Sequence, residues 1–134
     1  MREALRAALE DAGIDYVWRG TELGGFRRPR EGSRHSALHN DAFRGFADHM
    51  ETDRFLEGLS WLLESAGEVA TAFMCAESDW RRCHRRMIAD AVVAAGGRVI
   101  HLGGREDEEH VFHPDARVEE GRLVYDGDGQ ATLV

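Results

Sequence analysis

The stretch VATAFMCAESDWRRCHRRMIADAVVAAGGRVIHL (residues 69–102) decides the fold class. Residues 69–74 form a continuous apolar run, which is typical of a strand covered on both faces. A helical pattern follows over about 80–95 and stops at Gly96–Gly97, and residues 98–102 form a second apolar run. Strand, helix and strand joined by short loops predict a right-handed βαβ unit. We therefore expect an α/β protein with a mostly parallel sheet.

The rest of the chain predicts further helices, two short strand regions and polar connections. We expect helices over 1–12, 42–50 and 52–67, a buried strand over 14–18, a polar loop over 19–41, a solvated acidic run over 104–110, and a small C-terminal hairpin over 116–125 that turns near Glu120–Gly121. A loop as long as 19–41 inside a compact domain is usually functional or mobile. The 134 residues suit a single compact layered domain, residues 1–134.

Composition sets limits on location and partners. No apolar run approaches the roughly 20 residues that span a bilayer, and the N-terminus lacks the apolar core of a signal peptide. Two cysteines fit a reducing compartment, so the expected location is the cytoplasm. The 25 acidic and 17 basic side chains give a formal charge of −8, which argues against strong binding to duplex nucleic acid.

The segment MCAESDWRRCHRRM (74–87) gathers both cysteines with acidic, histidine and arginine side chains. It follows a predicted strand and opens a predicted helix, where α/β folds place their ligands. A cation in the first turn of a helix costs about 0.3–1 kcal/mol, so something negative must offset the arginines. Glu77 and Asp79 could do so through surface ion pairs, with Asp79 as N-cap. A bound anion is the other interpretation.

A reactive thiol is a third interpretation of this segment. A cysteine at a helix N-terminus among arginines is expected to be partly thiolate at neutral pH, and Cys83 occupies such a place. Cys83 is then the candidate nucleophile, with Glu77 or His84 as the proton carrier. The alternative is that Cys83 is simply a small buried apolar residue.

A metal site is a fourth interpretation. Cys75, Cys83 and His84 offer soft and borderline ligands. Their spacing matches no standard zinc signature, and adjacent Cys83 and His84 are expected to point in different directions on a helix.

The polar loop supplies a second group of candidate ligand-binding residues. Gly24 and Gly25 allow close approach of the backbone to a ligand, and Arg28 adds charge. Arg44 lies between two phenylalanines, which suggests that packing holds it. With Arg81 and Arg85 these residues could bind a phosphate group, although the loop lacks the P-loop motif. His35 and His39 are expected to lie on the surface.

Several motifs together resemble the domain-of-unknown-function 488 family of bacterial and archaeal proteins. The most specific element is Cys75-Ala76-Glu77 followed by Cys83-His84-Arg85, supported by a Leu-Gly-Gly stretch with its arginines (Leu23, Gly24, Gly25, Arg28) and a Phe-Arg-Gly stretch (43–45). The resemblance implies a compact α/β layer structure with the motif residues along one cleft, and it implies no particular reaction.

Members of that family usually begin with a strand, a helix and a second strand that precede the part matched by this chain. The resemblance therefore implies an N-terminally shortened version or a start that lies upstream. A shortened chain could cover its exposed sheet edge by forming a homodimer.

Two functional hypotheses follow from the sequence. The first is an enzyme-like site for a small phosphate-bearing ligand, such as a nucleotide or a nucleic-acid end, with Cys83 as its thiol. The second is a non-catalytic module in which the Cys/His cluster holds a metal or cofactor, or shapes a loop for a protein partner.

Overall fold

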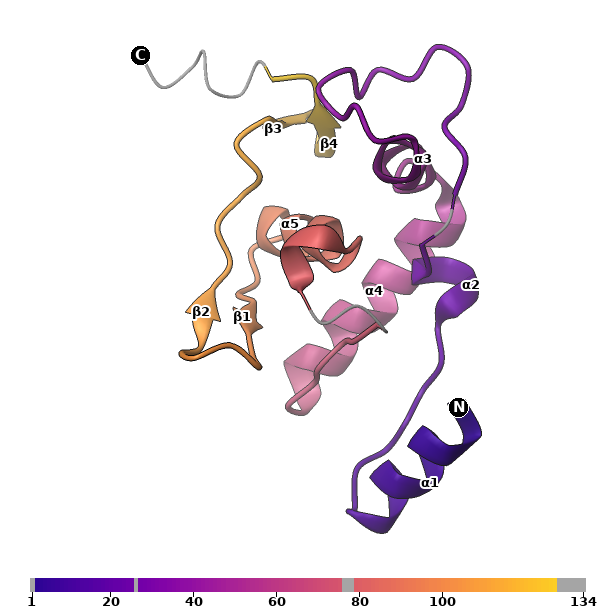
Figure 1. The fold of residues 1–134 in the computed structure, drawn as a ribbon, viewed down its shortest axis with the longest axis vertical. Coiled ribbons are helices and arrows are strands. Elements are labelled where there is room, and N and C mark those ends of the chain that lie inside the picture. The colour runs from indigo at the N-terminus through magenta and orange to yellow at the C-terminus, as the bar shows by residue number, and fades with distance from the viewer. Residues whose placement is uncertain (1, 26, 76–78, 128–134) are drawn as a thin grey trace.

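A computed structural model describes residues 2–25, 27–75 and 79–127 of the chain (Figure 1). Its helices are α1 (Arg2–Asp11), α2 (Gly20–Leu23), α3 (Asp41–His49), α4 (Asp53–Glu68), the 3-10 helix η1 (Trp80–Arg82) and α5 (Arg85–Ala94). Its strands are β1 (Ile100–His101), β2 (Glu108–Glu109), β3 (Ala116–Glu119) and β4 (Arg122–Tyr125). The fold is therefore mixed α and β, with helices in the majority.

Helices α3 and α4 form where the apolar spacing predicted them. The Thr52 side chain caps α4 by accepting the Phe55 N–H at 3.3 Å, and Phe55 and Leu62 lie on the buried face. Asn40 caps α3 in the same way. The two helices meet edge to face through Phe46 and Phe55, with ring centroids 5.8 Å apart. The hydrophobic core begins at this contact.

Glycine allows the polar loop to lie against α3. A Cβ at Gly45 would stand 2.1 Å from the Arg27 carbonyl oxygen, so only glycine permits the backbone of residues 27–28 to approach so closely. The long loop is therefore held against the helices by backbone packing.

The prediction of a single helix over 80–95 is only partly confirmed. Helix η1 ends at Arg82, the backbone of the next residue, Cys83, is extended (φ −128°, ψ 152°), and α5 starts at Arg85. The end of α5 agrees with the sequence, because Gly96 has a φ of 95° that stops the helix. The break falls in the middle of the cysteine and histidine cluster.

The expected mostly parallel sheet is wrong. The structure contains two separate antiparallel pairs: β1 pairs with β2 through Ile100 opposite Glu109, and β3 pairs with β4 through Ala116 opposite Tyr125. The β3–β4 hairpin turns at Glu120–Gly121, both with positive φ, as predicted. The βαβ unit is absent from the described residues because 69–74 has no strand beside it.

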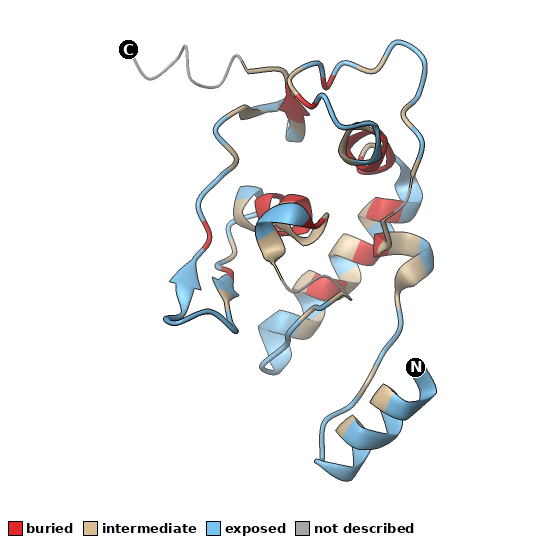
Figure 2. Ribbon diagram, viewed as in Figure 1, coloured by how far each residue is buried: buried red, intermediate tan, exposed pale blue. Residues whose placement is uncertain are grey.

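Two apolar runs that were predicted as buried strands are extended but exposed (Figure 2). Val69 and Met74 are each 62% exposed, and no backbone hydrogen bond joins residues 70–74 to another described residue. Residues 14–18 likewise form no strand, and Trp18 is 51% exposed. Apolar character alone cannot make a strand, because each backbone group also needs a partner.

Helix α1 forms as expected but lies at the edge of the molecule and has no buried residue. Arg2 stacks on Trp18, with its guanidinium carbon 4.3 Å from the ring centroid, and this contact joins the helix to the segment that follows it. Across the described residues the longest helix is α4, with 16 residues, and no helix has the length and apolarity needed to cross a bilayer.

A buried carboxylate joins α5 to the C-terminal strands. Asp90, fully buried, accepts hydrogen bonds from the Tyr125 hydroxyl at 2.7 Å, from His110 Nε2 at 2.7 Å and from the His113 backbone N–H at 3.1 Å. Burial and the Asp90 carboxylate raise the pKa of Tyr125 well above its usual value, so its hydroxyl stays protonated and donates. We call Asp90, His110, His113 and Tyr125 the Asp90 network.

We predict that Tyr125→Phe lowers the free energy of unfolding by about 1.5–3 kcal/mol, because it removes a buried hydrogen bond to a charged group. Tyr16→Phe is the matched control, since the Tyr16 hydroxyl has no hydrogen bond to a described residue. Urea denaturation of both variants measures the difference. Equal stability of the two variants would contradict this role of the network.

Candidate functional site

Cys83 and His84 converge because the chain changes conformation between them. Cys83 is extended, whereas His84 adopts helical angles (φ −58°, ψ −14°) as the N-cap of α5. Their side chains consequently meet, with Cys83 Sγ 3.5 Å from His84 Nδ1. The expectation that they point in different directions is wrong, because it assumed that both residues are helical.

Cys83 lies just before the start of α5, and only 6% of the residue is exposed. In addition to its contact with the His84 ring, the sulfur accepts a hydrogen bond from the Arg85 backbone N–H at 3.4 Å. This N–H is one of those that a helix N-terminus leaves without an intrahelical partner. The Cys83 sulfur thus has a hydrogen-bond donor on one side and the His84 imidazole on the other.

Cys75 completes a group of three ligand atoms. It ends the extended segment after α4 and is partly exposed, and its sulfur, the Cys83 sulfur and a His84 ring nitrogen all lie within 4.8 Å of one another. Both cysteines are free thiols. The structure therefore brings the three possible metal ligands close together, and their binding of a metal ion stays a prediction. Glu77, the other predicted proton carrier, lies outside the described residues.

The His84 ring is enclosed by the polar loop and α3. It packs against Phe46 with ring centroids 5.0 Å apart, and a Cβ at Gly25 would stand 2.8 Å from its Nδ1. Burial, followed by the charges of Arg85 and Arg27, lowers the pKa of His84. The imidazole is therefore neutral at physiological pH and can accept a proton or bind a metal ion.

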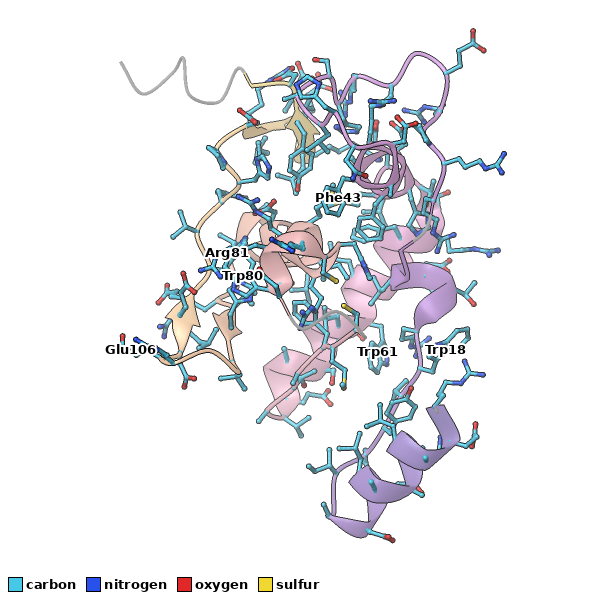
Figure 3. All side chains as sticks on the ribbon, viewed as in Figure 1. Trp18, Phe43, Trp61, Trp80, Arg81 and Glu106 are labelled. Carbon is cyan, nitrogen blue, oxygen red and sulfur yellow. The ribbon has the colours of Figure 1, made fainter. Side chains whose placement is uncertain are left out.

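The predicted anion-binding residues do not converge on one point. Arg81 forms two hydrogen bonds to Glu108, at 2.8 and 2.7 Å, and stacks on Trp80 (Figure 3). Arg44 donates to the Leu38 carbonyl and to Asp41. Arg28 is exposed. A ligand bound by Arg44 and Arg81 would have to compete with these carboxylates.

Of the predicted ligand-binding set, Gly25 and Arg85 lie beside the cysteine and histidine cluster. Gly25 faces the His84 ring, and the charge of Arg85 acts on the same ring. Gly24 instead ends α2, where a Cβ would stand 2.3 Å from the Gly20 carbonyl oxygen.

Arg27 also lies at the site, although the predicted ligand-binding set contains Arg28 and not Arg27. Its guanidinium group donates to the carbonyls of Gly24 and Thr21, and its charge reaches His84. Gly25 was the signal that could have pointed to Arg27. The backbone at Gly25 lies against the His84 ring, so the arginine two residues later is also held close to that ring.

A second cluster of possible metal ligands is structural. His35, Asp48 and Glu51 place their ligand atoms within 4.8 Å of one another, and His35 is fully buried, so its predicted surface position is wrong. Its Nδ1 accepts the Tyr125 N–H at 3.1 Å, which leaves Nε2–H to donate to Glu51 at 2.8 Å. Neither ring nitrogen is then available to a metal ion. His39 is exposed, as expected.

The comparison with known families identifies the chain. The family described as "Domain of unknown function DUF488" matches residues 1–92, which include Cys75, Cys83 and His84. The chain belongs to the DUF488 family. No curated protein and no solved structure matches it. Cys75, Cys83 and His84 thus lie within the part of the chain that matches the DUF488 family, whereas His110, His113 and Tyr125 lie beyond it.

The histidines predict how stability depends on pH. Burial is the largest cause of a lowered pKa at His49, His84, His101 and His113. The unfolded chain therefore takes up protons near the ordinary histidine pKa of about 6.5, before the folded chain does. The neutral histidines therefore contribute their full stabilisation above about pH 6.5, and this stabilisation is lost as the pH falls through their lower pKa values in the folded chain.

We predict that the free energy of unfolding decreases as the pH falls below about 6.5, and that His84→Gln makes this decrease smaller. The exposed His39 provides the control, because His39→Gln should leave the pH dependence unchanged. Urea denaturation at several pH values gives the slopes. A slope in His84→Gln equal to that of the original chain would show that His84 is not held neutral by the fold.

Proposed function

We propose that Cys75, Cys83 and His84 form a reactive-thiol site that acts on a small phosphate-bearing ligand. The observation that supports it best is the position of the Cys83 sulfur between the His84 imidazole and the Arg85 N–H. A base and a hydrogen-bond donor on one sulfur are what an activated cysteine nucleophile requires.

The proposal gives each residue a role. His84, neutral and 3.5 Å from the sulfur, accepts the Cys83 thiol proton at Nδ1. The Arg85 N–H stabilises the resulting thiolate, whose electron pair forms a bond to the electrophilic atom while the leaving group departs with its own pair. Cys75 lies close enough to act on the Cys83 adduct, and Glu77 is kept as a second proton carrier.

The phosphate-binding part of the proposal rests on the arginines. Arg85 and Arg27 place positive charge beside His84, and Arg28 is exposed nearby in sequence. Arg81 and Arg44 can bind the ligand only if they give up their hydrogen bonds to Glu108 and Asp41, respectively. A nucleotide or a nucleic-acid end has the required charge, whereas the net charge of −8 disfavours long duplexes.

We predict that iodoacetamide modifies Cys83 faster at pH 7 than it modifies a cysteine in an unfolded peptide, and that His84→Gln slows the reaction by about tenfold. Peptide mapping by mass spectrometry separates Cys83 from Cys75. His39→Gln is the matched control. Modification of Cys83 at the rate and pH dependence of an unfolded peptide would overturn the thiol role.

A metal-binding module is the alternative function, and the three ligand atoms within 4.8 Å favour it. Two thiolates and a neutral imidazole suit zinc, with the fourth position open to water or to another residue. The residues fit such an ion. Elemental analysis of protein purified under reducing conditions decides between the two: one equivalent of metal that is lost in Cys75→Ser supports this alternative, and metal-free protein with a reactive Cys83 supports the first proposal.

We further propose that residues 1–134 act as one domain in a reducing compartment, the cytoplasm, and that the chain forms a homodimer. Free thiols at the site require reducing conditions. The exposed Val69 and Met74 are apolar surface that a partner copy would cover. A monomer in sedimentation velocity at micromolar concentration would contradict the dimer.

A further inference from the structure

Cys83 is one of the residues that line a small pocket. Its volume is about 40 Å³, and residues from the polar loop, α3, η1, α5 and the segment after β2 line it: Leu38, Phe43, Arg81, Cys83, Arg86, Met87 and His113. Phe43 and Arg81, both labelled in Figure 3, come from α3 and η1. The pocket therefore joins the family-matched residues to the C-terminal part of the chain.

Apart from the Cys83 sulfur, the polar groups of this lining are donors or cations. Arg86 is partly buried as a residue, and its Nε is fully buried with no hydrogen-bond acceptor among the described residues. No ion pair joins its guanidinium group to a described carboxylate. His113 Nδ1 accepts the Asp115 N–H at 3.1 Å, which fixes Nε2–H as the donor of the neutral ring. No aspartate or glutamate is among the described lining residues. A buried donor without an acceptor is costly, so the lining is complementary to an anion.

The nearest carboxylate is already engaged. Asp90 lies one helical turn after Arg86, but its oxygens accept from Tyr125, His110 and the His113 backbone. Burial and the Arg86 charge lower the pKa of His113, so its ring stays neutral at physiological pH. The Asp90 network thus brings His113 to the pocket without neutralising Arg86.

We propose that this pocket binds the oxyanion group, carboxylate or phosphate, of the ligand that reaches Cys83, with Arg86 and His113 as the binding residues. Leu38, Phe43 and Met87 cover the adjoining apolar part of that ligand. The proposal rests on the function proposed above for the Cys83 thiol, and it adds the residues that select a charged ligand.

Two alkylating reagents of nearly equal size test the proposal. Iodoacetate carries a carboxylate and iodoacetamide does not, so the ratio of their rates at Cys83 measures anion recognition beside the sulfur. We expect Arg86→Gln to lower the iodoacetate-to-iodoacetamide ratio at least about fivefold, the effect of losing one charge-assisted hydrogen bond. Arg86→Lys should retain part of the preference, because the charge remains.

Arg82→Gln is the matched control for net charge. Arg82 is four residues earlier on the chain and its side chain is 81% exposed, so the same substitution there should leave the ratio unchanged. A ratio in Arg86→Gln equal to that in Arg82→Gln and in the original chain would overturn the proposal.

A second readout does not depend on thiol chemistry. The His113 ring resonances should shift when sodium acetate or inorganic phosphate is added, and this shift should be lost in Arg86→Gln. Saturation at lower concentration by phosphate than by acetate assigns a phosphate ligand, and the reverse order assigns a carboxylate. Shifts at His113 with an unreactive Cys83 would support the anion pocket while refuting the thiol function, and the absence of any shift would overturn the pocket.

Discussion

The buried Asp90 carboxylate is the interaction on which the rest of the structure depends. A carboxylate this deep in a core is tolerated only when donors surround it, and three donors from residues 110–125 do so. Within the described residues 100–127, the regular structure consists of the antiparallel pairs β1–β2 and β3–β4, so this segment has little secondary structure of its own to fix it. Hydrogen bonds to Asp90 dock this segment on α5 and close one side of the pocket beside Cys83.

The polar loop is also held in place by the C-terminal strand, through Tyr125. The Tyr125 backbone N–H sets the tautomer of His35, and His35 in turn donates to Glu51. Arg30 and Ser33 bind Asp48 through the Arg30 N–H and the Ser33 hydroxyl, which holds the loop against α3. Because Gly25 of this loop touches the His84 ring, the loop also sets the position of the imidazole next to the thiol. The site is thus enclosed by two segments that contain little regular structure.

The sequence could predict features that depend on local signals and missed those that depend on distant partners. The helix stop at Gly96 and the hairpin turn at Glu120–Gly121 follow from residue chemistry within a few positions. The prediction of a parallel sheet was wrong because the apolar run 69–74 needs a neighbouring strand to pair with, and no local sequence pattern shows whether one is present. Asp90 did carry a signal, since it lies on the apolar face of α5 three residues after Met87, and a charge there implies a buried partner. Its partners His110, His113 and Tyr125 could not be read from the sequence, because they lie 20–35 residues away.

The central functional claim is that Cys83 and His84 act as one coupled pair. It is tested most directly by an NMR titration of the His84 ring between about pH 4 and 10, in the original chain and in Cys83→Ser. Coupling predicts two inflections for His84 in the original chain, the second at the pH where the Cys83 thiol ionises as followed by ultraviolet absorbance, and a single inflection in Cys83→Ser. Identical single inflections in both proteins would show that the imidazole and the thiol titrate independently, and would contradict the account.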